Sequence, residues 1–200
     1  IQSGRDDAIE ASEHYFHRRT SSFKLPQVKF TAALSKFMPG SFTQNELRSA
    51  FCHARRKELN FLHENEAEAL PTPGSLRYIS INARRMWQFF DSGLFCFFAV
   101  LPETALSFSE TIRLSAVAAD FFSRLFTALK CSDENLQLTL EIVNPQKLTL
   151  TDKNRTYKFT STLPCRAEYN SSAAEIAAAP ALCAAKIAAQ IAGAYQLDDA

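Results

Sequence analysis

Two glutamates and two histidines near the start of the chain have the spacing of ligands on one side of a helix. Glu10 and His14 are four residues apart, as are Glu13 and His17, and side chains at that interval are neighbours on a helix surface. Carboxylate and imidazole groups can bind a transition metal. One helix supplies only part of a coordination shell, and no second cluster of this kind occurs. We therefore interpret the four residues as a solvent-facing ladder of charged contacts, keep a metal site as the alternative, and predict no cofactor.

A basic stretch at 43–63 has the residue types of a nucleic-acid reader. Thr43 and Glu46 have the spacing of a capping box, and apolar residues recur behind them at intervals of three and four. With the turn before it, this predicted helix is similar to a helix-turn-helix unit. Cations would then bind phosphates and two amides would reach base edges, which assigns the site to Gln44, Asn45, Arg48, Arg55, Arg56 and Lys57.

The charge balance of the chain limits that nucleic-acid hypothesis. The 22 Lys and Arg residues face 21 Asp and Glu residues, so the formal net charge is only +1. Long-range attraction to nucleic acid or to an anionic membrane is therefore not imposed by the whole chain. Glutamates within and after the helix dilute its positive charge further. The ordinary interpretation of such a helix is a solvated basic face.

An aromatic and basic stretch at 84–98 has the composition of a protein interface. Trp, Phe and Arg are the residue types that anchor such interfaces, and the candidate contact residues here are Arg84, Arg85, Trp87, Phe89 and Phe90. The alternative is a helical turn that folds onto a sheet and places its aromatic rings in the core.

The sequence lacks the common motifs that identify a catalytic site. The sequence contains no Gly-x-Ser-x-Gly elbow, no glycine-rich phosphate loop and no His-Glu-x-x-His pair. Cys52 and His53 are adjacent, but neighbours on a helix point about 100° apart and do not form a thiolate–imidazolium couple readily. An enzyme whose site leaves no local motif remains an alternative.

Cysteine usage and hydropathy indicate the cellular compartment in which we expect the protein. The five cysteines include no Cys-x-x-Cys pair, which argues against a zinc ribbon and suits a reducing cytoplasm. No apolar run of about 18 residues occurs, so we expect no membrane span. The chain starts at Ile1 without a basic and apolar leader, and we expect no signal peptide.

Three helices are predicted to position these residues in the first third of the chain, at 5–20, 27–38 and 43–63. Two aspartates at the start of the first and two arginines at its end suit the helix dipole. Pro26 and the Pro-Gly-Ser break at 39–41 bound the second helix, in which Val28, Ala32 and Leu34 face inward.

An acidic, proline-containing linker at 65–74 precedes a region that alternates as strands do. We predict strands at 75–83 and 94–101, a helix at 107–130 capped by Ser107 and Glu110, and a terminal helix at about 172–195 interrupted at Pro180. Three further strands between 135 and 162, joined by short turns, predict an antiparallel meander. Its polar side is expected to meet solvent or a partner and carries Gln137, Thr139, Glu141, Thr149 and Thr151.

The sequence therefore predicts an α+β protein with a helical segment at 1–64, a linker at 65–74 and a sheet domain at 75–200. The sheet is expected to be mostly antiparallel and five-stranded, with two helices packed on one face. We expect a non-catalytic, cytoplasmic regulatory or adaptor module that binds another protein and that can form a homodimer. A nucleic-acid-binding regulator and a small enzyme are the alternative functions.

Overall fold

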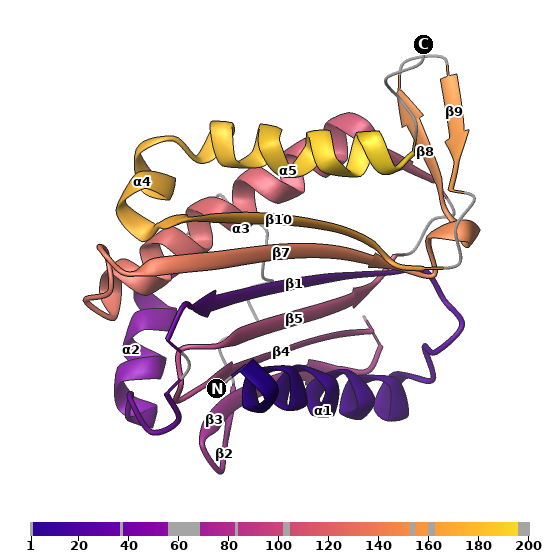
Figure 1. The fold of residues 1–200 in the computed structure, drawn as a ribbon. Coiled ribbons are helices and arrows are strands. Elements are labelled where there is room, and N and C mark those ends of the chain that lie inside the picture. Colours follow the sequence, from indigo (N-terminus) through magenta and orange to yellow (C-terminus); the bar gives the residue numbers. More distant parts are fainter. Residues whose placement is uncertain are drawn as a thin grey trace.

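A seven-stranded antiparallel sheet forms the centre of the molecule (Figure 1). The computed structural model describes residues 2–36, 38–55, 69–82, 84–101, 105–152, 155–159 and 163–195. In spatial order the strands are β10 (Cys165–Ser172), β7 (Asn135–Val143), β1 (Gln27–Leu34), β5 (Phe95–Val100), β4 (Arg85–Phe90), β3 (Ser75–Ser80) and β2 (Leu70–Thr72).

A second, three-stranded sheet lies at one end of the molecule, where β8 and β9 project beside the end of the last helix (Figure 1). It contains β6 (Ala105–Ser107), β8 (Thr149–Asp152) and β9 (Arg155–Lys158). The 3-10 helix η2 (Pro145–Lys147) leads from β7 into this sheet.

Helices cover the two faces of the main sheet unequally. On the inner face lie α2 (Gln44–Ala54), α3 (Phe108–Ala128), α4 (Ala173–Ala178) and α5 (Pro180–Ala194), whereas α1 (Gln2–Thr20) packs against the opposite, outer face (Figure 1). The expected α+β class with a large, mostly antiparallel sheet is confirmed, but helices cover both faces of the sheet and not one. The expected three leading helices and five strands are wrong, because the described residues contain five α-helices and ten strands.

Aromatic rings fill the inner core. The Trp87 ring is stacked 4.3 Å from Phe51 of α2 and 5.6 Å from Phe95 of β5, measured between centroids. Phe95 in turn meets Phe121 and Phe122 of α3 edge-on at 5.6 and 5.4 Å. Offset and edge-to-face pairs at such distances add to the stabilisation from burial. The many phenylalanines of the chain thus join two helices to the middle of the sheet.

The outer core is smaller because a single helix covers it. Phe16 of α1 is stacked 5.6 Å from Phe98 of β5, and Met86 of β4 packs in the same cluster. All three side chains are buried. The outer face is therefore apolar only below α1.

The segment 27–38 is not a helix: residues 27–34 form the central strand β1. Val28 and Ala32 are four residues apart, as on a helical face, but together with Phe30 and Leu34 they occupy every second position, which is the period of a strand. β5 and β7 flank this segment and pair with its backbone on both edges. Tertiary pairing therefore overrides the helical pattern.

The aromatic stretch after Arg84 is strand β4 and not the expected helical turn. Trp87 and Phe89 point into the inner core, while Met86 and Gln88 point outward beneath α1, and all four are buried. A strand covered on both faces lacks the alternating polar side that identifies a strand in a sequence.

The predicted meander is wrong in its pairing. β7 pairs with β1 and β10 in the main sheet, whereas β8 and β9 form an antiparallel hairpin in the second sheet. Strand β10 escaped prediction because its outward side chains, Arg166, Glu168 and Asn170, are polar and two of its inward ones, Cys165 and Ala167, are small.

Helix ends follow the sequence signals closely. Thr43 and Glu46 form both hydrogen bonds of a capping box at the start of α2, and the terminal helix breaks at Pro180 as expected. Ser107 caps α3 by accepting from the backbone N–H of Glu110, but the Glu110 side chain binds Arg113 instead of completing the box. α2 is described only to Ala54, and residues 56–68, which include the first four residues of the predicted linker 65–74, lie outside the described residues. The rest of that linker contains strand β2.

Both edges of the main sheet are protected against strand addition. At β10, the Gln190 side chain of α5 accepts from the backbone N–H of Glu168 at 3.0 Å and donates to the carbonyl of Glu168 at 2.8 Å. At the other edge, β2 is three residues long and contains Pro71, which has no N–H to donate. Such devices prevent edge-to-edge pairing between chains.

Replacing Trp87 tests the aromatic core. Trp87→Ala should lower the free energy of unfolding by about 3–5 kcal/mol, because it leaves a cavity in place of the largest fully buried side chain. Trp87→Phe should cost much less, since the indole N–H is buried without a hydrogen-bond partner in the structure and its loss leaves nothing unsatisfied. Urea unfolding of both variants measures the difference; equal losses would contradict this account of the core.

Removing the amide that covers β10 tests the edge. Gln190→Ala should cost about 1 kcal/mol through the lost hydrogen bonds and should increase self-association by exposing backbone groups. Denaturation and light scattering measure the two effects. Gln146→Ala, at an exposed glutamine of η2, is the matched control and should change neither quantity.

Candidate functional site

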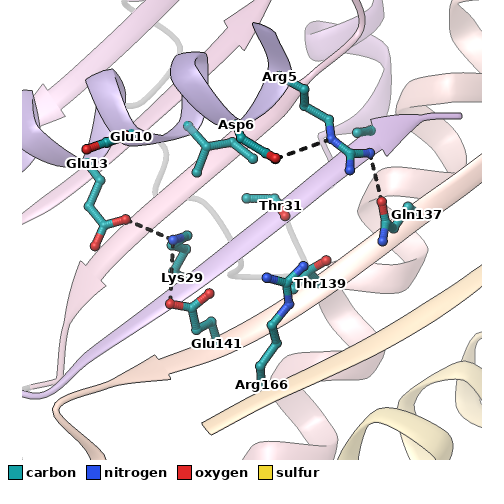
Figure 2. A pocket seen from close by; sticks show the side chains of 12 residues that line it. Arg5, Asp6, Glu10, Glu13, Lys29, Thr31, Gln137, Thr139, Glu141 and Arg166 are labelled. Carbon is teal, nitrogen blue, oxygen red and sulfur yellow. Dashed lines mark hydrogen bonds and ion pairs between the residues drawn. The ribbon is translucent and has the colours of Figure 1, made fainter. Parts of the chain in front are cut away.

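A polar groove of about 240 Å³ runs between α1 and the uncovered half of the outer sheet face (Figure 2). One wall is α1, with Arg5, Asp6, Ile9, Glu10 and Glu13. The floor comes from three neighbouring strands and comprises Lys29, Thr31 and Ala33 of β1, Gln137, Thr139 and Glu141 of β7, and Arg166 of β10. The expected polar side of 135–143 is thus the floor of the groove.

Strand register explains why the groove is charged. Arg166 pairs with Glu141, Glu141 with Lys29, and Lys29 with Phe98, so one row of side chains crosses the outer face from β10 to β5. The row changes from charged to apolar between Lys29 and Phe98, where the cover of α1 begins. Lys29 and Glu141 are poorly exposed, and their opposite charges make this burial tolerable because they pair with each other.

Lys29 joins the two sides of the groove through an ion-pair network. Its Nζ lies 2.8 Å from Oε2 of Glu13 on α1 and 3.5 Å from Oε1 of Glu141 on β7 (Figure 2). Burial alone would lower the pKa of Lys29, but the two carboxylates outweigh it and the pKa is raised. The lysine is therefore charged at neutral pH and holds α1 to the sheet.

The same Glu13 also reaches the end of α1. Its Oε1 lies 3.5 Å from Nε2 of His17, whose Nδ1 is 3.1 Å from Oγ of Ser22. Burial lowers the pKa of His17, and the nearby Glu13 carboxylate offsets only part of that effect. A neutral imidazole therefore lies between the groove and the connection to β1.

The open end of the groove is held by a chain of polar contacts. Arg5 Nη1 donates to Oε1 of Gln137 at 2.8 Å, and Gln137 Nε2 donates to Oε2 of Glu168 at 3.2 Å. Arg166 Nη2 lies 2.5 Å from the second oxygen of Glu168. Within the part of the chain that the structure describes, Glu10 has no hydrogen bond or ion pair.

The structure describes four of the six residues proposed to read nucleic acid. The Gln44 side chain donates to the carbonyl of Thr72 at 2.9 Å and so ties α2 to β2. Asn45 and Arg48 are exposed, whereas Arg55 ends the helix with its guanidinium 6.0 Å from the centre of the Phe51 ring. Arg56 and Lys57 lie outside the described residues.

The proposed interface residues divide between core and surface. Trp87 and Phe89 are fully buried, so they present nothing to a partner. Arg84 is exposed, and Arg85 and Phe90 are half-buried. Only Arg84, Arg85 and Phe90 therefore remain as candidate contact residues for a partner protein at this stretch.

The four residues considered for a metal are drawn into different contacts. Glu10 and Glu13 line the groove, His17 is buried, and His14 is exposed with its ring 6.5 Å from that of Phe23. Among the described residues no group of three or more His, Cys, Asp or Glu side chains is placed to hold a metal ion.

Sequence reasoning missed several groove residues for identifiable reasons. The helix predicted at 27–38 includes Lys29 and hides its strand-like alternation with Val28 and Phe30. Arg166 stands in an unpredicted strand, and Arg5 at the start of a helix had no signal pointing to the sheet. Only the alternation of 135–143 pointed to the floor.

A larger pocket of about 400 Å³ lies on the inner side, between the start of α3 and the ends of β1 and β5. Its lining is mainly apolar, with Phe30, Phe97 and Leu114 among the contacts. Glu110 and Arg113 at its rim bind each other through two hydrogen bonds of 2.7 and 2.5 Å. The outer groove has the greater number of polar groups for recognition.

No protein-family model, no curated protein and no solved structure matches this chain. None of the described helices has both the length and the apolar run that crossing a membrane requires.

Removing the Lys29 ammonium tests the ion-pair network. Lys29→Met should lower the free energy of unfolding at neutral pH by about 3 kcal/mol, because two poorly exposed carboxylates lose their counter-charge. Since folding raises the pKa of Lys29, the stabilisation is complete below the unfolded value of about 10.4 and is lost as the pH rises through the folded value. Urea unfolding should therefore show a difference between wild type and Lys29→Met that shrinks above that pH. A constant difference would contradict the ionic origin, and Lys29→Arg is the charge-conserving control.

Proposed function

We propose that the protein is a non-catalytic binding protein whose polar groove docks a segment of a partner protein. The observation that supports this proposal is the outer face of β7 and β10, which carries polar side chains held by hydrogen bonds and ion pairs beside α1 (Figure 2). A surface that is rigid and already ordered loses little side-chain freedom on binding.

Binding fits the groove better than chemistry because its buried charges are already neutralised. Glu13 and Glu141 both contact Lys29, which leaves no poised acid or base between them. The buried thiols are also unreactive, since burial raises the pKa of Cys96 and Cys183 to about 12 and that of Cys165 to about 11.

The blocked sheet edges favour docking on the face. Gln190 covers the outward backbone groups of Glu168, and Pro71 interrupts the opposite edge. A partner therefore meets side chains in the groove and does not extend the sheet.

Charge in the groove indicates the kind of segment that it accepts. Three cations, Arg5, Lys29 and Arg166, face four carboxylates, Asp6, Glu10, Glu13 and Glu141, which is one negative charge in excess. Glu10 is the carboxylate without an internal partner, and the side chain of Asp6 is 63% exposed. We infer a partner segment that places Lys or Arg opposite Glu10 and Asp6, with Gln137 and Arg166 available to its polar groups.

We propose that the protein acts as a regulatory or adaptor module in a reducing compartment. All five cysteines are free thiols, and Cys52 is exposed to solvent. Persistent free thiols suit the cytoplasm. A homodimer is compatible with the proposal, and light scattering distinguishes a second copy from a different partner.

Selection from a peptide display library tests the proposal. Peptides bound by the wild-type chain should be enriched in Lys and Arg, and Glu10→Lys should weaken their binding about tenfold or more through like-charge repulsion. Asp7→Lys is the matched control, because Asp7 is an exposed acid of the same helix outside the groove lining. Fluorescence anisotropy measures both affinities. Peptides that bind Glu10→Lys and wild type equally would contradict docking in the groove.

A further inference from the structure

A third hollow, of about 540 Å³, lies at the far end of α1 from the start of the chain. We call it the basic pocket, and its main lining residues are His17, Arg18, Ser21, Phe23, Lys24 and Arg84. They come from the last turn of α1, the connection to β1 and the turn between β3 and β4. Three separate segments thus bring basic side chains together.

Among the described residues, the three permanent cations of the basic pocket have no ion-pair partner. Arg18, Lys24 and Arg84 are exposed and their side chains have no hydrogen bond or ion pair in the described structure. No carboxylate is among the described residues that line the pocket. The ammonium of Lys147 adds a further cation nearby, since it donates to the carbonyl of Lys24. In a chain with a net charge of only +1, this is a local concentration of charge.

The helix dipole explains only part of this arrangement. Basic residues in a last turn favour the negative end of a helix, which accounts for Arg18. Lys24 follows the helix, and Arg84 belongs to a different part of the chain. Their presence at the same hollow needs another reason.

Arg84 has a backbone conformation that favours glycine. Its φ is +48°, in the left-handed region where a side chain with a Cβ is strained. Glycine or asparagine would suit this turn better for folding. The arginine therefore adds charge to the pocket at some expense of backbone strain, and such outliers are concentrated at binding sites.

An aromatic ring stands beside the cations. Phe23 is 55% exposed, and its ring is stacked on that of His17 with centroids 4.6 Å apart and planes inclined by 26°. His17 holds the ring in place from below the surface, because its own exposure is 7%. An anchored, exposed ring beside cations is the arrangement that binds a base and its phosphate.

We propose that the basic pocket binds a nucleoside phosphate, either free or as a unit of a single strand. The base stacks on Phe23, and the phosphate contacts the side chains of Arg18, Lys24 and Arg84. This site differs from the helix at 43–63 that the sequence suggested for nucleic acid, and it does not depend on partner docking in the groove.

Binding of adenosine monophosphate, inorganic phosphate and a ten-residue oligothymidylate to the full chain, measured by calorimetry in low salt, tests the proposal. Adenosine monophosphate should bind about tenfold more tightly than phosphate, because stacking adds to the charge contacts. Phe23→Ser should remove that preference. Arg84→Gly should weaken both nucleotide ligands about tenfold without lowering the urea midpoint, since glycine relieves the positive φ. Arg48→Ala, which removes an exposed cation from α2, is the control and should change nothing.

Each outcome of these titrations decides the question. Tighter, salt-sensitive binding of the oligonucleotide supports a single-strand site, and binding of the monophosphate without further gain supports a free nucleotide. Equal affinity for inorganic phosphate and nucleotide would show a plain electrostatic patch and overturn the proposal. Absence of binding at millimolar concentration, or unchanged binding by folded Arg84→Gly, would overturn it as well.

Discussion

The fold depends on a central strand that pairs with a neighbouring strand along each edge and packs against a different layer on each face. β1 pairs with β5 along one edge and with β7 along the other, so its backbone groups are paired inside the sheet. Val28, Phe30 and the following even-numbered residues enter the inner core. Its odd-numbered side chains face α1 and the groove. Every other layer is placed relative to this strand.

Incomplete cover of the outer face creates the candidate site. α1 supplies one large buried ring, Phe16, which is enough to cover Phe98 and Met86 but not the strands beyond β1. Polar side chains therefore line β7 and β10, where Glu141 is buried but paired with Lys29 and Arg166 is exposed to water. Lys29 stands at the boundary, and its two carboxylate partners fasten the helix to the sheet. The groove and the packing of α1 are two consequences of the same arrangement.

α1 links the two proposed binding regions. Glu13 contacts Lys29 in the groove and His17 beside the basic pocket, so one carboxylate touches residues of both. The acidic groove and the basic pocket lie along the same helix with opposite charge, although the whole chain is nearly neutral. Net charge alone therefore conceals how unevenly the surface is charged.

The amino-acid sequence by itself determined the local signals of this protein. The capping box at Thr43, the break at Pro180, the amphipathic helix after Ser107 and the alternation in 135–143 each depend on residues close together in the chain. Tertiary structure alone decided that residues 27–34 are a strand, because the hydrogen bonds that stabilise them come from segments more than 60 residues away. It also decided which polar residues meet, since Arg5, Lys29 and Arg166 approach one another only through strand register and the position of α1. Long-range pairing leaves no trace in the neighbouring residues. The sequence therefore pointed to Glu10, Glu13 and the polar side of 135–143 without joining them into one groove, and to His17 and Arg84 without joining them into one pocket.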